Sequence, residues 1–179
     1  MPYFYDISDS QDLTFKPRLF SDNEFLLQSE YRKVNKNSSH ILDFSFNKKD
    51  SDSKKGRNTH FFSNSEFILD DNFFSESSID LTIEKVSNDD YIDLYSLEST
   101  SPIIKDTSVL ENIIEFSGSQ NNFYLDFSVE SYETLNKPTS DRYEFVYPNY
   151  SLKKINFFED GIINSLEFIS SGNQKKHTT

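Results

Sequence analysis

Cysteine, tryptophan and alanine are absent from this chain of 179 residues, and it holds only four glycines and five prolines. Without cysteine there is no disulfide framework, no thiolate metal site and no cysteine nucleophile. Alanine is the best helix former, so its absence argues against an all-helical protein. The low glycine and proline content excludes a collagen-like or linker-like composition.

Long apolar runs and an excess of positive charge are also missing. No stretch approaches the roughly 18 apolar residues that a membrane-spanning helix needs. The formal net charge of −12 argues against electrostatic capture of nucleic acid or of an anionic membrane surface. The N-terminus lacks a charged segment followed by an apolar core, so no secretion signal is visible. We therefore expect either a cytoplasmic protein or an internal piece of a longer exported chain.

Phenylalanine and tyrosine are abundant, with 18 and 10 copies. They recur with a period of two in many short windows, which indicates strands with one apolar and one polar face. The cleanest windows are 42–47 (LDFSFN), 79–84 (IDLTIE) and 123–130 (FYLDFSVE). Helical spacing is poor almost everywhere, except that residues 89–97 favour a short helical turn.

The alternation predicts an all-β protein: an antiparallel meander of about 10–11 hairpin-connected strands over residues 1–170, followed by a polar tail over 171–179. The expected strands lie near 2–6, 12–19, 24–34, 40–47, 58–69, 73–86, 109–117, 122–133, 142–147, 151–158 and 162–170.

The connections differ in length between the two ends of the expected sheet. The longer ones share one end: 48–57, 87–108 and 134–141. Tight turns share the other: 35–39, 70–72, 118–121 and 148–150. Two further short connections, 20–23 and 159–161, fall on the long-loop end. Such segregation is typical of outer-membrane β-barrels, whereas alternation alone also fits a soluble sandwich.

Three blocks near the N-terminus carry a family resemblance: residues 2–7 (PYFYDI), 12–18 (DLTFKPR) and 30–32 (EYR). They resemble the start of the C-terminal barrel domain of the LPS-assembly protein LptD family, also called OstA or Imp. There an aromatic strand leads into a "DLTLTP"-like strand, and a later strand ends in an "EYR"-like triplet. Residues 88–95 and 142–148 are similar to later segments of that domain.

The resemblance implies a fragment of a large outer-membrane β-barrel. The family's periplasmic jellyroll domain, its cysteines and most of its barrel strands have no counterpart here. The implied function is transport and not catalysis: insertion of lipopolysaccharide into the outer leaflet of the Gram-negative cell outer membrane. The implied partners are lipopolysaccharide, an LptE-like lipoprotein plug, and a periplasmic LptA-like bridge that acts through the missing N-terminal domain. No cofactor is expected.

Five residues are candidates for function. Lys16, Arg18 and Arg32 alternate onto the polar faces of early strands, where contact with anionic lipid A and cross-strand pairing with acidic residues are both open. By resemblance, Pro2 and Pro17 lie close to the seam where the barrel opens laterally. Proline removes a ladder donor and so would weaken such a seam, although a place at a strand-end turn explains both equally well.

Other chemistries find little support in the sequence. The histidines, His40, His60 and His177, lack metal-ligand spacing, and no catalytic motif is present. We therefore expect no metal and no catalytic residue. The alternative function is a soluble β-rich module that binds carbohydrate or a partner protein. Such a module should gather its aromatic residues into one concave patch, whereas a barrel should place them outward.

Overall fold

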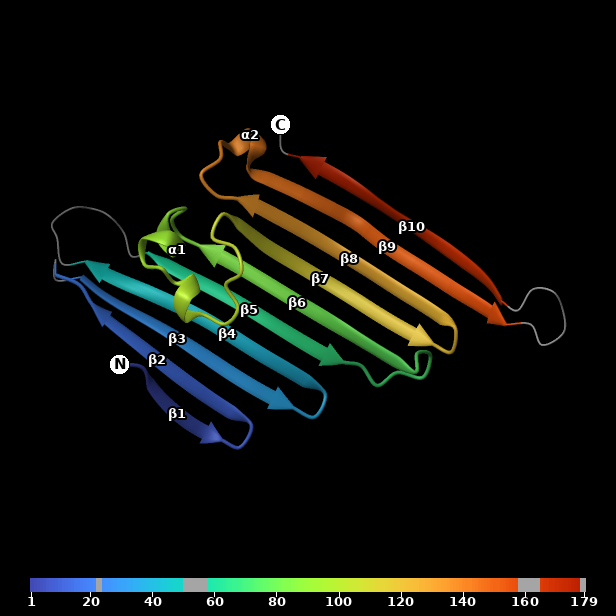
Figure 1. Ribbon diagram of the computed structural model, residues 1–179, viewed down its shortest axis with the longest axis horizontal. Helices are drawn as coiled ribbons and strands as arrows, with labels where there is room; N and C mark the ends of the chain where they lie inside the picture. Colours follow the sequence, from blue (N-terminus) through green and yellow to red (C-terminus); the bar gives the residue numbers. More distant parts are fainter. Residues whose placement is uncertain (22–23, 50–57, 158–164, 178–179) are drawn as a thin grey trace.

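The computed structural model describes residues 1–21, 24–49, 58–157 and 165–177, which form one antiparallel sheet (Figure 1). Ten strands follow one another in chain order, β1 to β10. Their bounds are β1 Tyr3–Ser8, β2 Gln11–Leu19, β3 Glu24–Asn35, β4 Ser38–Lys49, β5 Thr59–Ile68, β6 Glu76–Val86, β7 Val109–Gln120, β8 Phe123–Thr134, β9 Tyr143–Phe157 and β10 Ser165–His177. The predicted all-β meander is confirmed.

The pairing register gives the sheet two chemically different faces. One row across β2 to β5 contains Lys16, Gln28, Ser45 and His60, and we call the side that carries it the polar face. The neighbouring row contains Phe44 opposite Phe61 on the other side, which we call the apolar face. Because successive side chains of a strand point to opposite sides, the period-two pattern in the sequence becomes this separation of faces.

One expected turn is wrong. Residues 142–147 and 151–158 were expected as two strands joined by a turn at 148–150, but they form the single strand β9. Pro148 lies where the pairing with β8 shifts its register, between Ser128 and Glu130. Proline lacks an N–H, and such an irregularity is a place in a sheet where it is tolerated. The proline therefore marks a bulge and not the end of a strand.

The last strand also differs from the expectation. Residues 171–177 were assigned to a polar tail, but they continue β10 to His177 and pair with β9. Polar residues are compatible with a strand when its backbone is paired, and Lys175 also contacts Glu144 across the pair at 2.9 Å. The domain boundary expected at residue 170 is therefore not a boundary of the sheet.

The connections follow the expected division over much of the described chain. Tight turns at 9–10, 36–37 and 121–122 share one end of the sheet. The other end carries 87–108 and 135–142, which hold α1 (Tyr91–Leu94), η1 (Glu98–Thr100) and α2 (Thr139–Arg142). The predicted helical turn at 89–97 is confirmed by α1. The expected turn at 159–161 lies outside the described residues.

The sheet is open within the described chain. β1 pairs with β2 alone and β10 with β9 alone, so each presents one unpaired edge. In Figure 1 these two strands lie at opposite borders of the sheet, and the 87–108 segment lies across one of its faces. Among the described residues, no helix is long and apolar enough to cross a lipid bilayer.

Candidate functional site on the polar face

Strand β4 is buried on its polar side and exposed on its apolar side. Asp43, Ser45 and Asn47 are 0%, 3% and 4% exposed, whereas Phe44 and Phe46 are 38% and 40% exposed. This reverses the usual distribution in a soluble protein, where charged and amide side chains are mostly at the surface. The polar side chains of β4 are buried because residues 87–108 cover the polar face of β2 to β5. We call this segment the strap.

The strap lies on the sheet through its own apolar side chains. Tyr91, Ile92 and Leu97 are at most 1% exposed, and they join a buried cluster with Leu26 and Phe62 from the sheet. Burying a side chain of this size contributes roughly 1.5–3 kcal/mol. The small core of the molecule therefore sits between the strap and the polar face, over β3 to β5.

Beneath this core runs a chain of buried hydrogen bonds. Gln28 Nε2 donates to both carboxylate oxygens of Asp43, at 3.2 and 3.0 Å. Asp43 Oδ1 lies 3.0 Å from His60 Nε2, and His60 Nδ1 lies 2.6 Å from Ser45 Oγ. The Tyr91 hydroxyl of the strap lies 2.8 Å from the same Ser45 oxygen. Each polar group on this path has a partner, so the desolvation cost of burial is offset.

The Ser45, His60 and Asp43 side chains have the connectivity of a hydrolase triad. Their burial argues for a different role. His60 and Asp43 side chains are 0% exposed, and Tyr91 covers the Ser45 hydroxyl from the strap side. A substrate carbonyl therefore has no path to the serine oxygen. The arrangement instead joins the strap to the sheet through directional bonds.

The strap makes a second contact with the sheet where β3 begins and β4 ends. The Tyr95 hydroxyl of the strap donates to the Glu24 carboxylate and accepts from Asn47 Nδ2. Burial, followed by the hydrogen bond to Glu24, raises the pKa of the Tyr95 hydroxyl above its ordinary value. Burial likewise raises the pKa of Tyr91. Both phenols therefore remain protonated and available as donors at neutral pH.

The start of the strap is held by the connection between β8 and β9. Arg142 donates from Nη1 and Nη2 to the two carboxylate oxygens of Asp89, at 2.8 and 2.6 Å, and from Nε to Glu133 at 2.6 Å. The Asn136 amide adds a bond to Asp89, and its side chain donates to Asp90. The hydrogen bonds from Arg142 lower the pKa of the Asp89 carboxyl. We call this group the clamp.

The structure places the three predicted cations in two different environments. Lys16 Nζ lies 2.8 Å from Glu30 Oε2 and also donates to the carbonyl of Thr100 in the strap. Arg18 Nη1 donates to the Tyr95 carbonyl at 2.6 Å. Lys16 and Arg18 therefore lie together beneath the strap, and the strap supplies an acceptor to each of them.

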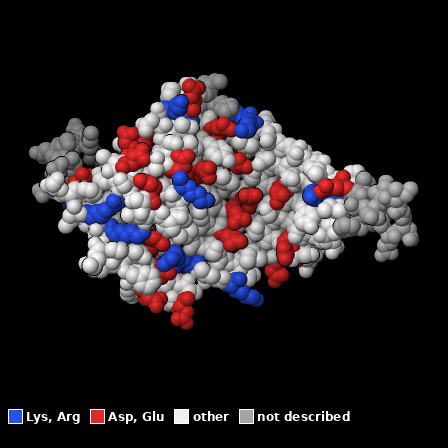
Figure 2. Space-filling view, in the orientation of Figure 1, with Lys and Arg blue, Asp and Glu red and all other residues white. Residues whose placement is uncertain are grey.

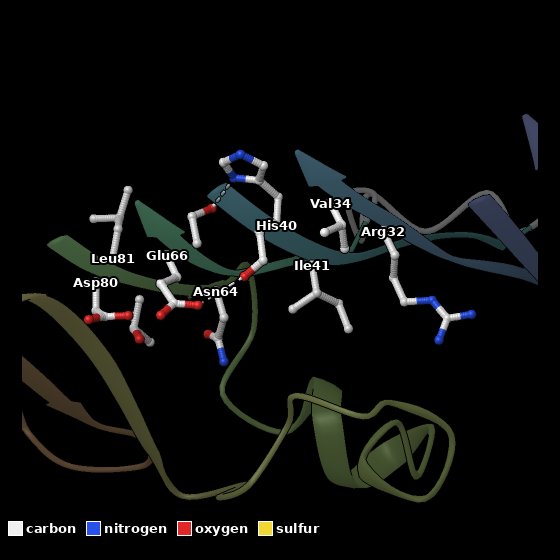
Figure 3. Close-up of a pocket in the computed structure, with 11 residues that line it drawn as sticks. Arg32, Val34, His40, Ile41, Asn64, Glu66, Asp80 and Leu81 are labelled. Carbon is white, nitrogen blue, oxygen red and sulfur yellow. Dashed lines mark hydrogen bonds between the residues drawn. The ribbon is translucent and has the colours of Figure 1, made fainter. Parts of the chain in front are cut away.

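Arg32 has a different environment, on the far side of Glu30 from the strap. Its Nε lies 3.0 Å from Asp12 and 3.5 Å from Glu30, and its side chain is 48% exposed. It lines a hollow of about 350 Å³ with Ile41 and Asn64. Figure 3 shows these side chains on the side of the sheet that faces the strap, together with Asp80.

The two candidate prolines lie near the free edge of the sheet. Pro2 immediately precedes β1, and β2 has no pairing partner in β1 beyond Phe15. The Phe20 amide donates to the Glu24 carbonyl, and because ladder bonds alternate along a strand, even-numbered residues of β2 bond to β3. The ring nitrogen of Pro17 therefore faces the β1 side and costs the β2–β3 ladder no bond. Pro17 lies within β2 and not at its end.

The structure brings four of the five predicted residues together. Pro2, Pro17, Lys16 and Arg18 line one hollow of about 280 Å³, which Thr100 of the strap completes. Arg32 does not belong to this group. The sequence placed Lys16, Pro17 and Arg18 on the right strand and Pro2 at the start of the first one, which begins one residue later at Tyr3. It contained no indication that the four residues share one cavity.

The polar face carries acidic side chains beyond the strap. Figure 2 shows Asp and Glu spread across the middle of this face, with Lys and Arg interspersed. Asp80 of β6 lies directly opposite Glu115 of β7. Within the described residues, no group of three or more histidine or carboxylate side chains is placed to hold a metal ion.

Sequence reasoning missed the strap residues that make the polar face a site. Tyr91, Tyr95 and Thr100 provide its hydrogen bonds to the sheet. Tyr91 and Tyr95 were expected only in a short helical turn, and Thr100 only in a long connection. A usable signal was present: the connection contains Ile92, Leu97 and the pair 103–104 (II), which is more apolar than a solvated loop requires. Such a connection should pack against something.

Comparison with known proteins gives no assignment. Neither the protein-family models nor the curated proteins include a match to this chain.

Proposed function

We propose that this chain forms part of an outer-membrane β-barrel of the LPS-assembly protein LptD family, which inserts lipopolysaccharide into the outer leaflet. One observation carries the proposal: the polar side of β4 is buried by protein, while Phe44 and Phe46 on its other side are exposed. An apolar surface that extends over a ten-stranded sheet needs a cover. Acyl chains would provide it from outside, with the polar face turned toward a lumen.

The strand lengths support this proposal. A strand tilted across a bilayer needs about 9–11 residues. β3, β4, β7 and β8 each have 12 residues, and β6 has 11. The exposed aromatic side chains are also distributed from β1 to β10, and are not gathered in one concave patch as a soluble binding module would require. They include Phe44, Phe61, Phe127, Tyr150 and Phe168.

The partners follow from the resemblance. The proposed substrate is lipopolysaccharide, with an LptE-like lipoprotein in the lumen and an LptA-like periplasmic bridge that delivers the glycolipid. In this scheme Lys16 and Arg18 face the lumen. Pro2 immediately precedes β1, and Pro17 lies on the stretch of β2 that β1 does not pair. A missing N–H there removes a donor for strand pairing and would favour a lateral opening.

Extraction of the complete protein tests the proposal. We expect the polypeptide encoded by the whole reading frame to partition with detergent, and to run faster on a gel when it is left unheated. The 179-residue chain alone should not insert, because the free edges of β1 and β10 would leave backbone groups unpaired in lipid. A complete protein that is monomeric and soluble without detergent would overturn the proposal in favour of a soluble module.

A further inference from the structure

Arg18 is a cation whose hydrogen bonding is incomplete. Its Nη1 donates to the Tyr95 carbonyl. Its Nε and Nη2 have almost no exposed surface and no hydrogen-bond partner among the described residues. Two unsatisfied donors on a charged group are costly, because each loses its bonds to water without replacement. The only other buried side-chain atom in this condition in the described chain is the Ser29 hydroxyl oxygen.

The two free donors of Arg18 form a matched pair. In a guanidinium group the N–H of Nε and one N–H of Nη2 point in parallel on the side away from Cδ. That pair forms the fork that binds two oxygens of a carboxylate or phosphate at once. The strap carbonyl therefore binds the third nitrogen, Nη1, and no described residue fills the two-pronged side of Arg18.

The surroundings of Arg18 favour an anion. Lys16 lines the same hollow, and the other lining residues are Met1, Pro2, Pro17 and Thr100, with no carboxylate side chain among them. The one carboxylate bonded to Lys16 is Glu30, which also contacts Arg32. The Glu98 carboxylate of η1 also interacts electrostatically with Arg18. The two cations of this hollow therefore face Glu30, which Lys16 shares with Arg32, and Glu98.

We propose that the Nε and Nη2 fork of Arg18, with Lys16 beside it, is a binding site for a phosphate group, free or as a monoester. The Tyr95 carbonyl keeps the guanidinium oriented, and the anion supplies the two acceptors that the described residues do not. Binding requires the residues that cover the fork to move outward, because Nε and Nη2 have almost no exposed surface. For a lipid headgroup as the source of the phosphate, the inference rests on the proposed function; for free phosphate, it does not.

Binding of inorganic phosphate to the complete protein in a non-ionic detergent tests the site, by isothermal titration at constant ionic strength. Arg18→Lys keeps the charge and removes the fork, so we expect its affinity for phosphate to fall at least about tenfold. Arg32→Gln is the matched control, since Arg32 is on the same face and already paired; its affinity should stay within about twofold. Equal loss in both variants, although only Arg32→Gln removes a charge, would show that phosphate binding does not depend on the fork of Arg18 and would overturn the site.

Two lipid arms separate the sources of the phosphate. Micelles containing phosphatidic acid carry a phosphate monoester, whereas micelles of phosphatidylcholine do not. Binding of phosphatidic acid that depends on Arg18 supports a lipid headgroup, and binding of inorganic phosphate alone supports a free anion. The inference would be overturned if neither phosphatidic acid nor inorganic phosphate binds, or if Arg18→Lys binds them as tightly as the unchanged protein does. Gel mobility of the same samples reports on the barrel separately, so failure of one proposal is distinguishable from failure of the other.

Discussion

The two faces of the sheet contrast most clearly in β5, where neighbouring residues have opposite environments. His60 is 2% exposed beneath the strap, and Phe61 is 42% exposed on the apolar face. The histidine is buried because its ring nitrogens have partners in Asp43 and Ser45. The phenylalanine is exposed because no described element covers it. Part of the polar face is thus covered by the chain itself, whereas no described residue covers Phe61 on the apolar face.

The largest effect should come from breaking the polar face at its centre. His60→Ala removes the donor to Asp43 and the ring that contacts Phe62 and Tyr91. Losing one partner of a buried pair costs about 3–5 kcal/mol. We expect this loss in the free energy of unfolding, measured by denaturant titration of the complete protein. His40→Ala is the control, since His40 bonds only to serine hydroxyls away from the strap. Equal effects of the two changes would contradict a special role for the buried network.

A charge on the apolar face should have the next largest effect. Phe44→Arg places a guanidinium near the middle of the apolar face, opposite Phe61. In a bilayer this costs about 2–4 kcal/mol. We expect that loss when unfolding is measured from lipid vesicles.

The control for this change lies on the other face. Ser151→Arg places the same side chain opposite Asp126, on the part of the polar face beyond the strap, and should change stability by about 0.5 kcal/mol. If Phe44→Arg is as mild as Ser151→Arg, the apolar face is not in contact with lipid.

Breaking the clamp should have the smallest effect on stability, and this effect should depend on pH. The pKa of Asp89 is lowered by its bonds to Arg142. A depressed carboxyl pKa gives stability that is complete above the unfolded pKa of about 4 and is lost as the pH falls through the folded pKa. The protection factor for hydrogen exchange at the Asn136 amide, which donates to Asp89, should therefore fall below about pH 4.

Removal of the arginine sharpens the clamp prediction. Arg142→Gln should cost about 1 kcal/mol or less, because the pair is partly exposed. The substitution should also raise the pH at which the Asn136 amide begins to lose its protection from hydrogen exchange. Asp106 provides an internal control: its pKa is lowered by bonds from Ser108 and not by arginine. Exchange at the Ser108 amide should keep its wild-type pH dependence in the variant; a parallel change at both sites would indicate general loosening of the strap.

Much of the fold followed from local patterns. Windows such as 42–47 and 123–130 predicted strands with the correct faces, because side-chain alternation depends only on neighbouring residues. The interpretation of Pro148 as a turn was incorrect, because a proline at a bulge and a proline at a strand end look alike in the sequence. The polar residues after 170 were taken for a tail, because local hydropathy does not report backbone pairing with a distant strand.

The candidate site was predictable only in part. Lys16 and Arg18 were selected for their place on the polar face, and that placement holds. Their partners were not predictable: Lys16 contacts Thr100, 84 residues away, and Arg18 contacts Tyr95, 77 residues away. No periodic pattern connects positions at such separations.

The amino-acid sequence by itself determined that the chain alternates into strands with one apolar and one polar side, since that choice depends on neighbouring side chains. Only the tertiary structure decided that residues 87–108 fold back over the polar side, because this requires apolar contacts and hydrogen bonds between distant segments. The same folding left two donors of Arg18 without acceptors among the described residues, which no property of β2 alone could have shown.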